Sequence, residues 1–310
     1  GLVPDLFPGG QSFSDTKIRS RLASFWSGRL SPLAGLDLEG MMAAGRDGAL
    51  KAMWIVGADP AGDGQKAGEA LGRIPFLVVQ DLFMTETASM AEVVLPAASF
   101  AETDGTFINL TGRLQAVRAA NRPPGETRPD WWIIVELARR MVEGQRQRAW
   151  AFSSAAEVLA EIAKALPGYR GVDYAGLGEE GWQRPARQPA RRIFARVEPA
   201  PASGDPDYPL ILVTGRLLYD RGTLLRRSER IQRLVPEAYV RIHPSDAKKL
   251  GLADGDEVAL VSAHGRLGLA VEISDEVVPG VVFAPINLSE VPLGVLYADR
   301  WTLPRVQIVK

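Results

Sequence analysis

The sequence contains no cysteine and only two histidines among its 310 residues. Without thiolate ligands this stretch has no place for an iron–sulfur cluster of the usual kind, a cysteine-based zinc site or a disulfide. The two histidines, His243 and His264, stand alone without metal-ligand spacing. We interpret both as loop residues, because titratable groups at functional sites usually occur in coupled constellations. No nucleophile paired with a base stands out either, so we predict no catalytic and no metal-binding residue.

An excess of charge and a long apolar run are lacking as well. Lys plus Arg is 36 and Asp plus Glu is 37, which gives a formal net charge of −1. No overall field therefore draws the chain to nucleic acid. The best candidate for a membrane span, residues 131–142, contains Glu136, Arg139 and Arg140, and charges of this kind are unfavourable in a bilayer core. No signal peptide pattern opens the sequence. We expect a globular protein without nucleic-acid partners and without direct membrane insertion.

In the first part of the chain, strand and helix signals alternate. Short continuous apolar runs have the pattern of parallel strands buried on both faces; they lie at residues 52–56, 76–80 and 92–95. Helices are expected over residues 131–142 and 154–166, and Ser154 with Glu157 forms a capping box at the second. This alternation predicts an α/β fold, a Rossmann-like doubly wound parallel-sheet domain over residues 1–184.

The remainder of the chain has a different composition. Residues 185–207 are rich in proline, alanine and arginine and are predicted to be an interdomain linker. Residues 208–310 are β-rich, with a short helix over residues 244–250 that has proline in its first turn. Strands are expected at residues 210–214, 239–242, 257–262, 267–273, 281–284 and 306–309. This pattern predicts a second domain that is a small closed barrel of mixed strands.

Polar residues follow several of the predicted strands. At the carboxyl ends of parallel strands, N–H groups, hydroxyls and helix N-termini gather, which suits a polyanionic dinucleotide. Asp81 is suited to accept hydrogen bonds from a guanine, and Arg216 is suited to a phosphate. The candidate cofactor-binding residues are Gly57, Asp59, Asp81, Thr85 and Thr87 in the first domain, and Thr214, Gly215 and Arg216 in the second, with a crevice expected between the domains.

Each of these residues also has a purely structural interpretation. Asp59 and Asp81 would cap helices, Gly57 and Gly215 would supply permissive turns, and Arg216 would pair with a local carboxylate. Fold alone does not establish a working site. A further basic group is open to two interpretations, an anion site or a solvated loop, and the intervening Glu229 favours the loop; the group is Arg226, Arg227 and Arg230.

Three motifs taken together carry a family resemblance. They read Asp-x-Phe-x-Thr-Glu-Thr-Ala at residues 81–88, Val-Val-Leu-Pro-Ala at residues 93–97 and Glu-x-Asp-Gly-Thr-Phe-x-Asn at residues 102–109. In combination they resemble the molybdopterin oxidoreductase superfamily, which includes formate dehydrogenases, nitrate reductases and the large iron–sulfur subunit of respiratory complex I. The order of elements from residue 239 onward is similar to the double-psi barrel that closes molybdopterin-dinucleotide enzymes. The chain resembles a C-terminal part of such a subunit.

Three details favour the complex I subunit within this superfamily. Leu110-Thr111-Gly112-Arg113-Leu114-Gln115 is similar to the Glu-Gly-Arg-x-Gln of complex I subunits, no histidine follows Tyr219, and Pro285-Ile286-Asn287-Leu288 stands where catalytic members commonly have Phe-His-Phe. The resemblance then implies a redox-silent scaffold in the NADH-quinone oxidoreductase subunit that passes electrons through iron–sulfur clusters to quinone. It implies no cofactor in this stretch, clusters upstream, other peripheral-arm subunits as partners, and a peripheral location on the cytoplasmic side of the plasma membrane.

Two other functions remain open. In the first, the chain is the cofactor-binding part of a catalytic molybdenum enzyme such as a formate dehydrogenase, and the candidate residues grip molybdopterin guanine dinucleotide. In the second, it is a nucleotide-binding or assembly module without a redox role.

Overall fold

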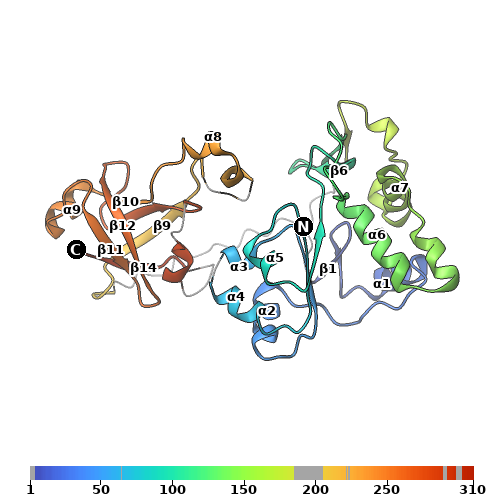
Figure 1. The fold of residues 1–310 in the computed structure, drawn as a ribbon, viewed down its shortest axis with the longest axis horizontal. Coiled ribbons are helices and arrows are strands. Elements are labelled where there is room, and N and C mark those ends of the chain that lie inside the picture. Colours follow the sequence, from blue (N-terminus) through green and yellow to red (C-terminus); the bar gives the residue numbers. More distant parts are fainter. Residues whose placement is uncertain are drawn as a thin grey trace. The chain divides into compact units, whose positions relative to one another are not determined.

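The chain folds as two compact units, which the computed structural model describes over residues 4–63, 65–184, 205–220, 222, 224–288, 292–297 and 302–310 (Figure 1). Unit 1 comprises Gly1–Ile193 and unit 2 comprises Phe194–Lys310. The predicted linker lies outside the described residues up to position 204. Within the described part of the chain, no helix is both long enough and apolar enough to cross a membrane.

The centre of unit 1 is a three-stranded parallel sheet. Its strand order is β3 (Met53–Val56), β4 (Leu77–Asp81) and β5 (Val93–Pro96). One face packs against α2 (Leu38–Arg46) and α4 (Gln65–Leu71), and this core contains Leu71, Leu77 and Val79, all at most 1% exposed. Two short helices, α3 (Pro60–Asp63) and α5 (Glu86–Ser89), follow the carboxyl ends of β3 and β4. The sheet and its helices thus present their loops at one edge.

The opposite face of this sheet corrects one expectation from the sequence. The register places Trp54, Val78 and Val93 in one row across the three strands. Trp54 and Val93 are 38% and 37% exposed. The prediction that these strands are buried on both faces is therefore wrong for this face, as far as the described residues cover it.

The rest of unit 1 is built around a second, smaller core. An antiparallel sheet of β6 (Gly105–Ile108), β7 (Arg113–Val117) and β8 (Trp182–Gln183) carries Leu114 into a cluster with Leu159 of α7 (Ala155–Ala165). The remaining elements are β1 (Leu6–Phe7), β2 (Gln11–Ser12), α1 (Thr16–Phe25), α6 (Asp130–Met141) and the 3-10 turns η1 (Gly144–Trp150), η2 (Pro167–Tyr169) and η3 (Ala175–Leu177).

Unit 2 is a closed barrel with the strand order β10-β12-β11-β14-β9-β13. β9 pairs in parallel with β13, β10 pairs in parallel with β12, and the other neighbours are antiparallel. Leu212, Val240, Ile242 and Leu260 fill the interior without measurable exposure. The elements are β9 (Leu210–Gly215), η4 (Leu225–Arg227), α8 (Glu229–Gln232), β10 (Tyr239–Ile242), α9 (Pro244–Leu250), β11 (Glu257–Val261), β12 (Arg266–Ile273), β13 (Val281–Pro285), η5 (Leu293–Leu296) and β14 (Arg305–Val309).

The predicted fold class, an α/β domain with a parallel sheet followed by a β-barrel domain, is confirmed. The capping box at α7 differs in detail. The Ser154 hydroxyl accepts from the Glu157 N–H as expected, but the Glu157 carboxylate reaches back to Ser153 instead of Ser154. The carboxylate thus satisfies the N–H one residue earlier, which serves the same end of the helix.

Candidate functional site

The first group of candidate residues lies at the carboxyl edge of the parallel sheet. β3 leads into Gly57, which has a φ of +61°, a left-handed conformation that glycine adopts at little cost. The N–H of Gly57 donates to the carbonyl of Gln80 at 2.9 Å. This bond continues the β3–β4 pairing by one residue and turns the chain toward Asp59.

Asp59, Thr85 and Thr87 are brought together behind this edge. The Asp59 carboxylate accepts from the Thr87 N–H at 2.9 Å and from the Thr87 hydroxyl at 2.7 Å. The Thr87 hydroxyl in turn accepts from the N–H of Ala61, while Thr85 caps α5 by accepting from the N–H of Ala88. All three side chains are at most 6% exposed. They hold the loops after β3 and β4 to each other, and whether they also contact a cofactor stays a prediction.

Asp81 ends β4 and is 6% exposed. One oxygen of its carboxylate accepts from the N–H of Phe83 at 3.2 Å, which orders the loop that follows. This is a local turn contact and not a helix cap, so the capping role predicted for Asp81 is replaced by a turn role.

Gln80, the residue before Asp81, is fully buried and was not predicted as part of the site. Its side-chain N–H donates to the Asp130 carboxylate at 2.5 Å, at the first residue of α6. Just before α6, Arg128 pairs with the end of β5 through bonds with Pro96 and Ala98. The N-terminus of α6 therefore lies at the carboxyl edge of the sheet. The sequence signal for this contact was a Gln at the end of an otherwise apolar strand, because a polar side chain that is buried there needs a hydrogen-bond partner.

The second group of candidate residues lies at one end of the barrel in unit 2. β9 and β13 run parallel, with Thr214 beside Ala284 and Gly215 beside Pro285. The Thr214 hydroxyl is 2.9 Å from the hydroxyl of Tyr297. A Cβ on Gly215 would meet the Phe283 ring at 3.2 Å, so the strand end favours a small residue here.

Arg216 directly follows β9 and is exposed. It makes no ion pair with a carboxylate among the described residues, and the local pairing expected under the structural interpretation stays a prediction. An exposed guanidinium is suited to a phosphate or carboxylate oxygen.

Three residues at the same barrel end were missed as site residues by the sequence reasoning. Asn287 has a φ of +60°, a conformation that asparagine tolerates better than most residues. Its side-chain N–H donates to Asp220, a buried carboxylate that also accepts from the N–H of Gly222. Tyr297 contacts Thr214. The sequence signal was an Asn two residues after a β-strand.

The other groups noted in the sequence lie outside these two groups of candidate residues. The ring nitrogen Nδ1 of His243 accepts from the N–H of Ser245 and caps α9, and His264 lies in the turn between β11 and β12. Arg227 and Arg230 are exposed on either side of Glu229. No cluster of His, Cys, Asp or Glu that would hold a metal occurs in the part of the chain that the structure describes.

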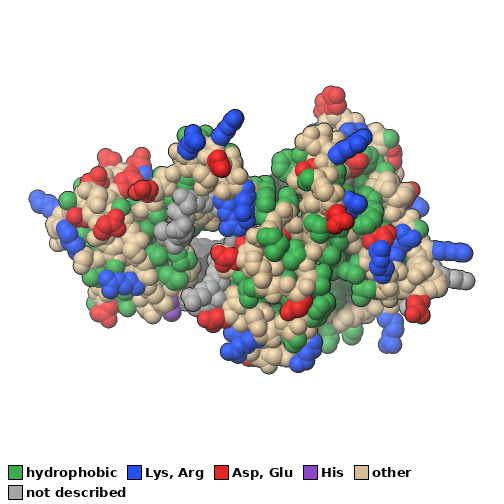
Figure 2. All heavy atoms as spheres, in the orientation of Figure 1, with side chains coloured by type: hydrophobic (Ala, Val, Ile, Leu, Met, Phe, Trp, Pro, Cys, Tyr) green, Lys and Arg blue, Asp and Glu red, His purple; other side chains and the backbone are tan. Residues whose placement is uncertain are grey.

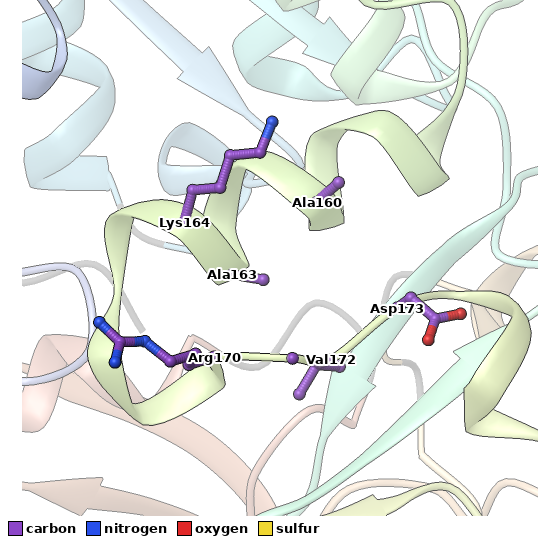
Figure 3. A pocket seen from close by; sticks show the side chains of 7 residues that line it. Ala160, Ala163, Lys164, Arg170, Val172 and Asp173 are labelled. Atoms are coloured by element: carbon purple, nitrogen blue, oxygen red, sulfur yellow. The ribbon is translucent and has the colours of Figure 1, made fainter.

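A surface hollow of about 480 Å³ lies between α7 and residues 170–173. Small side chains create it, those of Ala160 and Ala163 on α7. Figure 3 shows that its charged side chains, Lys164, Arg170 and Asp173, point in different directions. Because they do not converge on one point, we assign no ligand to this hollow.

The fold defines a class, an α/β domain followed by a closed six-stranded barrel. Residues 29–140 match the family model described as "Molybdopterin oxidoreductase", and residues 210–308 match the one described as "Molydopterin dinucleotide binding domain". The chain thus belongs to the molybdopterin oxidoreductase superfamily.

Curated relatives match nearly the whole chain. The F420-dependent formate dehydrogenase 2 subunit alpha of Methanococcus maripaludis is 36% identical over 94% of this chain and 46% of its own length. A NADH-quinone oxidoreductase subunit of Rhizobium meliloti is 31% identical over 96% of this chain and 34% of its own length. The chain therefore spans about half the length, or less, of the curated relatives it matches.

A solved structure supports the fold. Acetylene hydratase from Pelobacter acetylenicus is similar with a TM-score of 0.64 over 88% of this chain and 46% of that chain, at 18% sequence identity.

Proposed function

We propose that this chain forms the dinucleotide-binding half of the large subunit of a molybdenum oxidoreductase of the formate dehydrogenase type. The observation that carries the proposal is Arg216, an exposed guanidinium without an ion-pair partner among the described residues. It stands at the end of a strand in the region that matches a dinucleotide-binding family model.

The residues present fit such a cofactor. Arg216 and the Thr214 hydroxyl are suited to phosphate oxygens, and the side-chain amide of Asn287, two residues after β13, adds a donor. In unit 1, Asp81 retains a carboxylate oxygen suited to the N–H groups of a guanine. Asp59, Thr85 and Thr87 would act indirectly, because the bonds between Asp59 and Thr87 and the cap that Thr85 gives to α5 fix the segment that follows Asp81.

The chemistry itself would come from the cofactor. When bound, the metal and its pterin supply the two-electron redox step, while the protein supplies binding and orientation. This chain would bind and position the dinucleotide at strand ends.

The choice of enzyme type rests on similarity. Formate dehydrogenase subunits at 34% to 36% identity support a formate dehydrogenase-like subunit over the complex I subunit at 31%. Partners would then be the other subunits of such an oxidoreductase.

A second candidate function is the redox-silent scaffold of a NADH-quinone oxidoreductase subunit, with the peripheral arm of complex I as its partner. Two features favour it, namely the sequence Leu110-Thr111-Gly112-Arg113-Leu114-Gln115 and the absence of histidine after Tyr219. Under this function the retained site would hold no dinucleotide.

The proposal is tested by titrating guanosine diphosphate and adenosine diphosphate onto the purified chain by calorimetry. Saturable binding that prefers the guanosine nucleotide is expected, because guanine presents two adjacent donors to a carboxylate at Asp81, its N1–H and its 2-amino group, whereas adenine presents only its 6-amino group. Equal binding of both nucleotides, or none, would count against a guanine dinucleotide site.

A further inference from the structure

The connection between β9 and β10 contains a cluster of arginines at residues 224–234, here called the arginine segment. It has four arginines and one glutamate, whereas residues 235–310 have ten Asp or Glu and seven Lys or Arg side chains. The segment is therefore positively charged, while the part of unit 2 that follows it is negatively charged. Figure 2 shows Lys or Arg side chains projecting from the place where α8 lies in Figure 1.

The backbone of the arginine segment is held by its own hydrogen bonds. The side-chain N–H of Gln232, at the end of α8, donates to the carbonyl of Leu225 in η4 at 2.9 Å. The N–H of Gln232 donates to the carbonyl of Ser228, and the N–H of Leu234 donates to the carbonyl of Ile231. The charged side chains thus project from a defined backbone, which reduces the conformational entropy that binding a partner would cost.

Two exposed arginines lie on the same side of α8. Arg230 and Arg233 are three positions apart, at the second residue of the helix and at its C-cap. Neither guanidinium makes an ion pair or a hydrogen bond with a residue that the structure describes. Like charges at this spacing repel each other and weaken a helix slightly. Carboxylates of a bound partner would replace this repulsion by attraction.

The composition around these arginines indicates a protein partner. Leu224 and Leu234, at the two ends of the segment, are 50% and 57% exposed. Arginine next to exposed apolar side chains is typical of protein interfaces, because its planar guanidinium binds a carboxylate through two hydrogen bonds. The segment has no aromatic residue on which a base could stack. The negative charge of residues 235–310 would also repel an extended polyanion such as a nucleic acid or an anionic bilayer.

We propose that the arginine segment is a docking surface for a separate protein whose contacting surface is acidic. A second copy of this chain would offer carboxylates too, but a contact between two different surfaces of identical chains forms rings or open filaments. A separate protein neutralises the arginines without that consequence. The inference goes beyond the proposed function and does not rest on it, because the arginine segment contains none of the residues proposed to bind a cofactor.

The test is carbodiimide coupling in the native assembly that contains this sequence. Carbodiimide joins a lysine amine directly to a neighbouring carboxylate and does not couple arginine. Arg230→Lys and Arg233→Lys therefore keep the charge and add a reactive amine. Arg266→Lys, at an exposed position at the start of β12, is the matched control. Mass spectrometry identifies the coupled peptides, and mixing isotope-labelled with unlabelled subunits distinguishes a second copy from the same chain.

The proposal predicts coupling from residue 230 or 233 to an Asp or Glu of a different polypeptide, at least about tenfold above coupling from residue 266. Coupling only within the chain or to a second copy overturns the proposal, as does coupling that does not exceed the control.

Charge reversal gives a second readout in the same assembly. Arg230→Glu combined with Arg233→Glu is expected to lower the retention of the coupled polypeptide at low salt at least about tenfold, whereas Arg266→Glu leaves it unchanged. Unchanged retention in the double variant overturns the proposal. A double variant that instead loses binding to duplex DNA or to phosphatidylserine vesicles would assign the arginine segment to a nucleic acid or a membrane, which overturns it as well.

Discussion

The Asp59 carboxylate accepts two hydrogen bonds from Thr87, one from its N–H at 2.9 Å and one from its hydroxyl at 2.7 Å. The two residues are 28 positions apart; Asp59 lies in the loop after β3 and Thr87 in α5, the short helix after β4. Because neighbouring loops at the carboxyl edge are joined in this way, the position of Asp81 depends on residues that need not touch a ligand.

Thr87→Val is expected to destabilise unit 1. The substitution removes the hydroxyl that donates to Asp59 and accepts from Ala61. The buried Asp59 carboxylate and the part-buried Ala61 N–H then lose that partner. Loss of such bonds costs about 1–3 kcal/mol. Urea denaturation measures the free energy of unfolding. Thr87→Ser, which keeps the hydroxyl, is the matched control, and equal stability of the two variants would contradict the account.

Asp246 makes the barrel sensitive to acid. The hydrogen bond from Lys249, followed by the N–H of Gly280, lowers the pKa of the Asp246 carboxyl below its usual value. A lowered folded-state pKa means that the stabilisation is present above about pH 4, the unfolded pKa, and is lost as pH falls through the folded pKa.

Asp246→Asn is therefore expected to lower stability at pH 7 and to flatten its decline below about pH 4. Thermal melting across about pH 2–7 measures this decline. Asp275→Asn removes an exposed carboxyl in the same unit and serves as control. The account fails if the two variants show the same pH profile.

Gly265 and Gly268 form a matched pair in the hairpin of β11 and β12. A Cβ at Gly265 would lie 2.5 Å from the carbonyl oxygen of Val295, whereas a Cβ at Gly268 would meet nothing within 4 Å. Gly265→Ala should lower the free energy of unfolding by about 1–3 kcal/mol, since backbone must move. Gly268→Ala should stay within about 0.5 kcal/mol of the unchanged protein. Chemical denaturation of both variants compares them, and equal losses would contradict the structure of this turn.

Arg216→Ala is expected to weaken pyrophosphate binding about tenfold, because one charge-assisted contact with a phosphate is removed. The melting temperature should not change, since Arg216 is exposed and makes no ion pair among the described residues. Arg266→Ala removes an equally exposed arginine at the start of β12 and controls for net charge. Calorimetry at low salt gives both affinities, and a loss of the same size for Arg266→Ala would place the phosphate elsewhere.

The sequence predicted the elements better than their contacts. Apolar runs such as Met53–Val56 identified the parallel strands, because local hydrophobicity reports burial in a sheet. The sequence could not show that Trp54 and Val56 are exposed, since an apolar side chain does not indicate which element packs against it. The same run is compatible with both outcomes.

In the candidate site too, local features could be predicted from the sequence and long-range contacts could not. Gly57, Asp81 and Thr85 were placed at strand ends from turn and capping chemistry, which is local. The bonds from Asp59 to Thr87 and from Gln80 to Asp130 join positions 28 and 50 residues apart. Asn287 was passed over because its left-handed backbone and its bond to Asp220 arise only when the barrel closes.

The most direct test of the central claim is metal and pterin analysis of the complete native subunit that contains this sequence. The account predicts molybdenum or tungsten together with a fluorescent oxidation product of a pterin and a guanine nucleotide. Iron without molybdenum, tungsten or pterin would contradict it and would leave these strand ends as a scaffold in an electron-transfer subunit.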